Sequence, residues 1–341
     1  MKHWINIIVL AILIGILFIL NLSVGTIDIP FKNTWQILWG DESQQEIWRN
    51  IVIRSRLPQA LTSIAAGAGL AVSGLQMQTV FRNPLAGPSV LGVSSGATLG
   101  VGFVVLLSGS LGGVALSRLG YLGDAAMSIA AVIGSLAVLS LIVWVSQKVK
   151  SNVTLLVIGV MIGYLATAII GVLKFFSAEE DVKAFVVWGL GSFSRVSGNQ
   201  MMLFVTLMAI LLPISMLLVK SLNLLLLGDG YARSLGLSIN RARTQVIICS
   251  GTLAAIVTAY CGPIMFLGLA IPHLCRSIFR TSDHRILLPA CILVGAALAL
   301  LCNLVARMPG FEGVLPVNSV TALIGAPIVC IVLFGKRKQE R

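Results

Sequence analysis

Ten long apolar runs restrict this chain to very few architectures. They lie at roughly 4–24, 58–80, 89–108, 124–146, 152–176, 199–219, 244–260, 262–280, 286–305 and 317–335. An α-helix needs about 20 apolar residues to cross the hydrocarbon core of a bilayer. Runs of this length favour helices over barrel strands, because a helix satisfies its backbone hydrogen bonds within one segment. We therefore predict an all-α integral membrane protein with about ten transmembrane helices, folded as one transmembrane domain over residues 1–341.

The charged residues agree with this interpretation. They make up 11% of the chain, whereas a soluble domain has about 25%. The net charge of +12 is by itself also typical of nucleic-acid-binding proteins. With the N-terminus placed inside, however, 15 of the 24 Lys and Arg residues and three of the 12 acidic residues fall on the inner side. This positive-inside pattern predicts a multi-pass protein of the cell membrane with both termini cytoplasmic, surrounded by lipid and binding no nucleic acid.

A polar interruption separates the sixth and seventh runs. It covers residues 227–243 and reads L-G-D-G-Y-A-R-S-L-G-L-S-I-N-R-A-R. Asp229 and Ser238 are residue types that cap helix N-termini, and Gly236 can end a helix in the left-handed conformation. The pattern predicts two short helices joined at a sharp bend on the cytoplasmic side, a suitable element for a cytoplasmic partner to grip.

The source of energy is not apparent in the chain itself. It has no G-x-x-x-x-G-K-[ST] loop for binding nucleotide phosphates. Ion-coupled carriers normally bind their ion with carboxylate or His side chains inside the bilayer, and the runs contain no deep carboxylate. An energy-supplying partner is therefore expected, and an ion-coupled secondary transporter or channel is the alternative. A membrane-embedded enzyme is disfavoured, since no His, Cys, Asp and Glu cluster suggests catalytic residues or a metal site.

Two runs are rich in small residues and enclose a helix-breaking turn. The second run contains S-I-A-A-G-A-G-L-A-V-S-G from Ser63, and the third begins L-G-V-S-S-G-A-T-L-G from Leu91. Such spacing allows close helix packing in lipid. The alternative is a pathway lining in which Gly92, Ser94 and Ser95 face water. The segment R-N-P-L-A-G-P between the runs cannot continue a helix, and it is a candidate cytoplasmic gate.

These motifs, taken in order, resemble a known family. The first half contains R-L-P at Arg56–Pro58, A-G-A-G-L-A-V-S-G, R-N-P-L-A and L-G-V-S-S-G-A. The second half contains A-R-S-L-G from Ala232, C-G-P-I-M-F-L-G-L-A-I-P-H-L-C-R from Cys261, S-D-H-R from Ser282 and L-P-V-N-S-V-T-A-L-I-G-A-P from Leu315. Together they resemble the FecCD-type permeases of ATP-binding-cassette (ABC) importers, which take up ferric siderophores, haem and cobalamin.

The resemblance implies a permease of the cobalamin-permease type and a set of partners. These are a second permease copy, giving a homodimer as the simplest case, two cytoplasmic ATP-binding subunits and an extracytoplasmic substrate-binding protein. The chain itself is expected to be no enzyme and to bind no cofactor or metal, because the partner subunits use the ATP and Mg. The expected cargo is an iron complex, with a ferric siderophore first and haem or cobalamin behind it.

The resemblance also implies roles for individual residues. The cytoplasmic coupling loop, residues 221–243, is expected to contact the ATPase through Gly228, Asp229, Ala232, Arg233, Leu235 and Gly236. The gate turn is expected at Asn83, Pro84, Leu85 and Ala86. Docking of the binding protein is expected at Arg49, Arg54, Arg56 and Arg307, although Gln59 replaces the second arginine of the usual R-L-P-R. His273 and His284 lie in motifs shared whatever the cargo, so we expect them to be structural.

Overall fold

The structure, a computed structural model, describes residues 2–25, 27–40, 45–108, 121–149, 151–196, 198–308 and 314–339. The regular elements of these residues are helices, with no strand among them. Before the first polar turn come α1 (Lys2–Ser23), α2 (Phe31–Leu38), α3 (Glu46–Asn50), the π-helix η1 (Ile51–Arg56) and α4 (Leu57–Phe81). The middle holds the 3-10 helix η2 (Pro88–Leu91), α5 (Val93–Ser108), α6 (Tyr121–Lys148), α7 (Asn152–Phe176), α8 (Glu179–Gly189) and α9 (Gly198–Met216). The rest is α10 (Val219–Leu226), α11 (Asp229–Ser234), α12 (Ile239–Cys261), α13 (Leu267–Phe279), α14 (His284–Ala306) and α15 (Val317–Gln339).

Every one of the ten predicted runs forms a helix. They correspond to α1, α4, α5, α6, α7, α9, α12, α13, α14 and α15. Within the described residues, seven helices are long and apolar enough to cross a membrane, and α5, α13 and the apolar part of α15 are shorter apolar segments. The prediction of an all-helical membrane protein is confirmed.

The eighth run differs from its prediction as a full span over 262–280. Its helix, α13, has 13 residues, which corresponds to roughly 20 Å of rise against the roughly 30 Å of a bilayer core. Gly262 and Phe266 have positive φ values of 76° and 67°, which the helix cannot accommodate. Residues 262–266 therefore form a non-helical connection, in which the Met265 amide donates to Asn318 Oδ1 at 3.1 Å.

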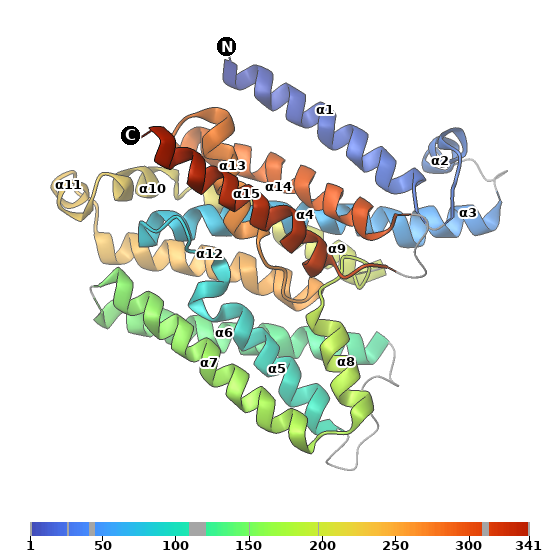
Figure 1. Ribbon diagram of the computed structural model, residues 1–341, viewed down its shortest axis with the longest axis horizontal. Coiled ribbons are helices and arrows are strands. Elements are labelled where there is room, and N and C mark those ends of the chain that lie inside the picture. Colours follow the sequence, from blue (N-terminus) through green and yellow to red (C-terminus); the bar gives the residue numbers. More distant parts are fainter. Residues whose placement is uncertain are drawn as a thin grey trace.

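Helix α4 is the centre of the molecule, as Figure 1 shows by the helices packed around it. In the membrane-spanning stretch that contains it, 89% of residues are buried. Its small residues explain this position, because they let neighbouring backbones come close. A Cβ atom at Gly67 would collide with the backbone of Gly295 in α14, and one at Gly74 with the backbone of Gly268 in α13.

The pair α5 and α6 is built in the same way. A Cβ atom at Gly96 would meet the Gly134 carbonyl oxygen at 2.5 Å, and one at Gly100 would collide with the Ala130 carbonyl. Tight packing is thus the outcome for the small-residue stretches at both places. Helices α1, α7 and α9 are more open to the surroundings: only 17–22% of their membrane-spanning segments is buried within this chain.

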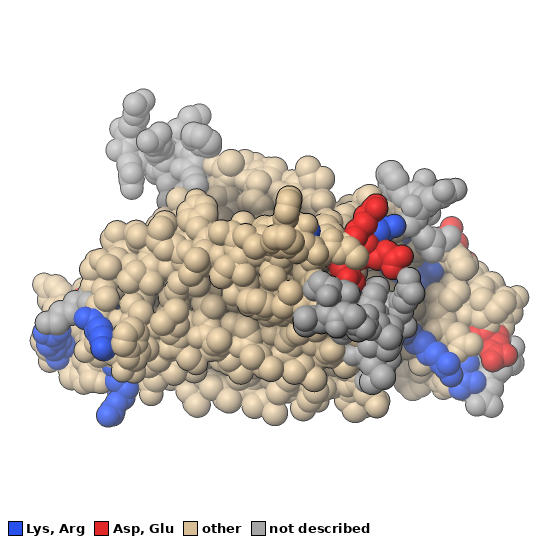
Figure 2. Space-filling view, turned by 90° about the horizontal axis from the view of Figure 1, so that it is seen from below, with Lys and Arg blue, Asp and Glu red and all other residues tan. Residues whose placement is uncertain are grey.

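The two ends of the bundle differ in charge and in structure. Figure 1 places α11 at one end and α2 and α3 at the other; following the charge count, we name these the inner end and the outer end. Figure 2 shows a broad uncharged band across one face, with Lys and Arg alone at one side of it and mixed charges at the other. Such a band is the expected lipid contact of a membrane protein.

Candidate functional site

Residues 227–243 of the coupling loop form one short helix, α11, and the start of a long one, α12. Helix α11 ends at Ser234, Gly236 follows with a φ of 85°, and the Leu237 amide bonds back to the Ala232 carbonyl at 3.0 Å. The prediction of two separate short helices was wrong, because the second is the first turn of α12, which begins at Ile239. The loop therefore continues directly into a helix that spans the bundle.

The predicted caps differ from the observed ones. Gly228, with φ 101°, occupies the N-cap position of α11, and Asp229 is the first helical residue. The Asp229 carboxylate is instead ion-paired with Arg82 and lies 3.4 Å from an Arg243 nitrogen. Ser238 does occupy the N-cap of α12, but its side chain makes no capping hydrogen bond. The Asp229 carboxylate, which was predicted to cap the helix locally, thus pairs with arginines that are distant in the sequence.

An apolar strip covers the outward face of the coupling loop. Leu227, Tyr231 and Leu235 are spaced four residues apart and are 56%, 73% and 61% exposed. Side chains at this spacing share one face of a helical segment. Ala232 is fully buried on the opposite side, so it packs within the chain. Of the predicted coupling residues, Leu235 and the exposed Arg233 are the ones whose side chains are open to a partner.

The gate turn is a built structure. Arg82 ends α4 in the left-handed conformation with φ 48°. Asn83 Oδ1 accepts a hydrogen bond from the Leu85 amide at 2.9 Å, and the Pro84 carbonyl lies 2.7 Å from His273 Nε2 of α13. Leu85 is 51% exposed, so this large apolar side chain of the turn faces outward.

Polar side chains fasten the inner end of α4 to its neighbours. Gln78 accepts a hydrogen bond from Arg276 at 2.6 Å, and Asn152 at the start of α7 donates to the Val80 carbonyl at 2.9 Å. His284 lies 2.8 Å from both Thr79 Oγ1 and Asn223 Oδ1. Both histidines named in the sequence motifs therefore bind protein groups. Among the described residues, no three His, Cys, Asp or Glu side chains gather as a metal site.

The predicted pathway residues lie inside helix contacts of this chain. Gly92 ends η2 with φ 73°, and a Cβ atom there would stand 3.0 Å from the Gly159 carbonyl oxygen in α7. The Ser94 hydroxyl is 3.3 Å from that of Thr258 in α12. Ser95 faces Gly163 of α7. Packing accounts for Gly92, and the pathway role of Ser94 and Ser95 stays a prediction.

Two of the four predicted docking arginines are buried at the outer end. Arg56 and Arg307 are 3% and 7% exposed. Arg56 donates to the Leu22 carbonyl at 2.9 Å, and Arg307 donates to Gln59 Oε1 at 3.0 Å and to the Asn21 carbonyl at 2.7 Å. These two guanidinium groups already bind the chain's own acceptors, of which Gln59 is one, and the docking role of the four arginines stays a prediction.

A cavity nevertheless gives access to this pair. It measures about 200 Å³ and is lined by Gly25, Ile27, Ile51, Ser55, Arg56, Gln59, Arg307 and Val314. Arg307 Nε has no hydrogen-bond partner among the described residues. Burial, and then the charge of Arg56, lowers the pKa of Arg307 to about 10, so the Arg307 guanidinium is charged at neutral pH. Arg49 and Arg54 are exposed on the adjoining α3 and η1.

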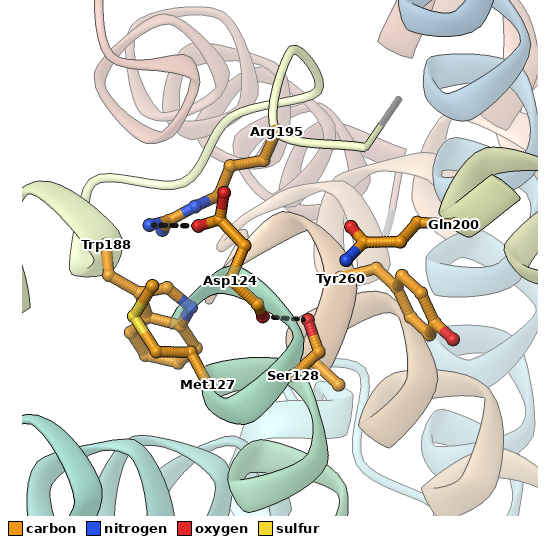
Figure 3. Close-up of a pocket in the computed structure, with 8 residues that line it drawn as sticks. Asp124, Met127, Ser128, Trp188, Arg195, Gln200 and Tyr260 are labelled. Atoms are coloured by element: carbon orange, nitrogen blue, oxygen red, sulfur yellow. Dashed lines mark hydrogen bonds and ion pairs between the residues drawn. The ribbon is translucent and has the colours of Figure 1, made fainter. Parts of the chain in front are cut away.

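The sequence did not predict a second cluster of polar residues at the outer end. In Figure 3, Asp124 of α6 and Arg195 of the loop after α8 point toward each other, with 3.7 Å between their charged atoms. Burial lowers the pKa of Arg195, and Asp124 opposes the shift. The cavity that they line with Trp188, Gln200 and Tyr260 measures about 10 Å³, which is room for a water molecule. The cluster therefore fastens the loop to α6 and is too small to hold cargo.

Comparison with known proteins gives a consistent result along nearly the whole chain. The model of the FecCD transport family matches residues 12–335. The hemin transport system permease protein HmuU of Yersinia pestis is 34% identical over 332 residues, which cover 97% of this chain and 96% of that protein. The vitamin B12 import system permease protein BtuC of Serratia proteamaculans is 34% identical over 325 residues, covering 95% and 90%.

A solved structure is similar over the same extent. It shows an inward-facing conformation of a transporter assigned to the metal-chelate type of ABC transporter. Its sequence is 30% identical, the TM-score is 0.81, and the match covers 97% of this chain and 99% of that one.

Proposed function

This chain belongs to the FecCD transport family and is a membrane permease of the ABC type, and we propose that it imports an iron complex, with a ferric siderophore as the leading cargo. Haem and cobalamin are the alternatives, since similar permeases are named for hemin and vitamin B12. The observation that carries the importer role is the agreement of relatives and structural neighbour over at least 95% of the chain in each pairwise match.

Nothing on the described surface selects among these cargoes. The enclosed cavities at the outer end measure about 10 and 200 Å³, and a drug-sized ligand needs roughly 300–1,000 Å³. We infer that cargo passes between two copies of this chain and is selected by a substrate-binding protein. In this proposal the second copy of the chain packs against the exposed faces of α7 and α15.

The inner end supplies the features of an ATPase contact. The apolar strip of Leu227, Tyr231 and Leu235 resembles the anchors of a helix that lies in a groove. In this proposal two ATP-binding subunits bind it and use ATP and Mg, while the permease does no covalent chemistry. Gly228 and Gly236 set the bend, and the gate turn at Asn83, Pro84, Leu85 and Ala86 responds to the movement.

The outer end supplies the features of a docking surface. The 200 Å³ cavity beside Arg56 and Arg307 has room for one carboxylate side chain, and Arg307 Nε is a donor that lacks an acceptor within the described part of the chain. Arg49 and Arg54 would attract acidic groups around it, since Arg binds carboxylates bidentately. An acidic side chain of the binding protein, inserted between the arginines, is the contact that we propose.

Uptake by the reconstituted importer tests this function. The permease, its ATP-binding subunits and the binding protein encoded beside it would be placed in liposomes and offered a ferric siderophore, haem or cobalamin. We expect ATP-dependent uptake of the iron siderophore. Preferred uptake of haem or cobalamin would overturn the cargo, and uptake driven by a proton or sodium gradient with the permease alone would overturn the importer itself.

A further inference from the structure

We infer that Asp229 is the positioning residue that connects the coupling helix α11 to the gate turn, acting inside the chain and not on the ATPase. The inference rests on the function proposed above. Its basis is the double contact of one carboxylate: Oδ1 pairs with Arg82 at the start of the gate turn, and Oδ2 lies 3.4 Å from Arg243 in the first turn of α12. One side chain thereby joins three elements.

The packing of α11 gives this contact its importance. The helix has six residues, and Ala232 is its one buried side chain. Glycines with positive φ stand on both sides of it, Gly228 and Gly236. Because so little apolar surface fixes α11 to the bundle, packing alone transmits its movements weakly. The carboxylate at its first position is the described side-chain link from α11 to the gate turn.

The gate turn, in contrast, is stiff where the link meets it. Arg82 is held in the left-handed conformation at the end of α4, and two residues later the Pro84 carbonyl is bonded to His273. A pull on the Arg82 side chain therefore moves the turn as a unit. Leu85, an outward-facing side chain of that unit, is three residues away.

The scarcity of acidic residues in this part of the sequence singles out Asp229 for this role. Between Asp181 and Asp283 it is the one acidic residue of the sequence. Asp283 is already engaged, because its carboxylate accepts hydrogen bonds from the Arg285 amide and from Asn223. The Arg243 side chain is 6% exposed, and a carboxylate close to a buried guanidinium is favourable. Asp229 lies within reach of Arg243 and pairs with Arg82 at the same time.

An exposed ion pair adds little to stability, and the Arg82 and Asp229 side chains are 42% and 43% exposed. A link between moving parts does not require a large contribution to folding. It requires that the two parts keep a fixed separation while the bundle changes shape. We therefore expect its loss to lower the efficiency of transport far more than the stability of the permease.

The chain offers a closely matched control for Arg82. Arg280 also ends a helix, α13, in the left-handed conformation with φ 48°, and it is exposed. In the complete importer in liposomes, Asp229→Asn and Arg82→Gln are expected to reduce cargo taken up per ATP hydrolysed by roughly tenfold while ATP hydrolysis continues. Arg280→Gln should leave the ratio unchanged. The double variant should be no worse than Asp229→Asn alone, because that change already removes the pair with Arg82.

Equal ratios in Asp229→Asn, Arg82→Gln and the unchanged chain would overturn the inference, as would strictly additive losses in the double variant. A second measurement is independent of the cargo and of the ATPase. Spin labels at Leu85→Cys and Tyr231→Cys, with Cys330→Ser because Cys330 is the exposed cysteine of the described chain, report the distance between turn and helix in the permease alone. Asp229→Asn should broaden the distance distribution, and an unchanged distribution would overturn the link even if the proposed function fails.

Discussion

The outer and inner ends of this bundle use arginine in opposite ways. At the outer end, Arg56 and Arg307 are buried and donate to main-chain and amide oxygens of their own chain. At the inner end, Arg82 is half-exposed and pairs with a carboxylate 147 residues away. The first arrangement fixes the shape of a surface before any partner arrives. The second joins elements that can move relative to each other.

The largest expected effect follows from the burial of Arg307. Arg307→Ala leaves Gln59 Oε1 and the Asn21 carbonyl without their donor, so the free energy of unfolding should fall by about 3 kcal/mol. Unfolding titrations in detergent micelles measure this. Arg54→Ala changes an exposed arginine nearby, so it is the control and should leave stability unchanged. Equal stability of the two variants would contradict the claim that the buried outer-end arginines fix the structure of that end.

At the inner end, substitutions should weaken binding of the ATP-binding subunits and leave the stability of the permease unchanged. Replacing Arg233 and Leu235 with Glu places charge on the apolar strip, where Leu235 is 61% exposed. Loss of a central apolar anchor costs about 2 kcal/mol or more of binding. We expect the double variant to lose co-purification with the ATP-binding subunits and to lose ATP-driven uptake. Its stability against unfolding should equal that of the unchanged permease. Normal uptake in vesicles would contradict the coupling role of the strip.

A smaller effect is expected from the exposed outer arginines. Arg54→Ala should weaken binding of the substrate-binding protein by about 0.5–1 kcal/mol, since exposed charge pairs contribute at most this much. The loss should shrink as salt is raised, and surface plasmon resonance at two ionic strengths would show it. A loss that is independent of salt would indicate that Arg54 acts by packing instead of charge.

The smallest effect concerns Asp181 at the outer end, which is 1% exposed and whose carboxylate oxygens have no hydrogen-bond partner among the described residues. Burial, and then Glu180, raises the pKa of this carboxyl. The folded-state pKa of this carboxyl lies above its unfolded value, so the fold loses stability as the pH rises from the unfolded pKa to the folded pKa. Asp181→Asn removes this cost and should therefore stabilise the permease more at high pH than at low pH. The gain should vanish below the ordinary pKa of an aspartic acid, about 3.9, and a pH-independent gain would contradict the charge explanation.

The helices themselves could be predicted because run length alone decides them in a membrane. The α12 boundary could not, since Ser238 was expected to begin a separate short helix and the structure continues it into the span. The roles of Asp229 and Arg307 were also beyond sequence reasoning. Their partners, Arg82 and Asn21, are 147 and 286 residues away, and no local pattern reports such a contact. The sequence also does not show that Arg49 and Arg54 are exposed while Arg56 and Arg307 are buried.

The glycines of α4 have a consequence for how freely this sequence can change. Gly67 and Gly74 touch neither the apolar strip nor the arginine cavity, yet any side chain there would occupy space already filled by the backbone of α14 or α13. A library of random substitutions selected for uptake should accordingly tolerate changes at many surface positions and reject them at these two. The residues that tolerate substitution least in a transport protein would then be glycines that contact neither cargo nor partner.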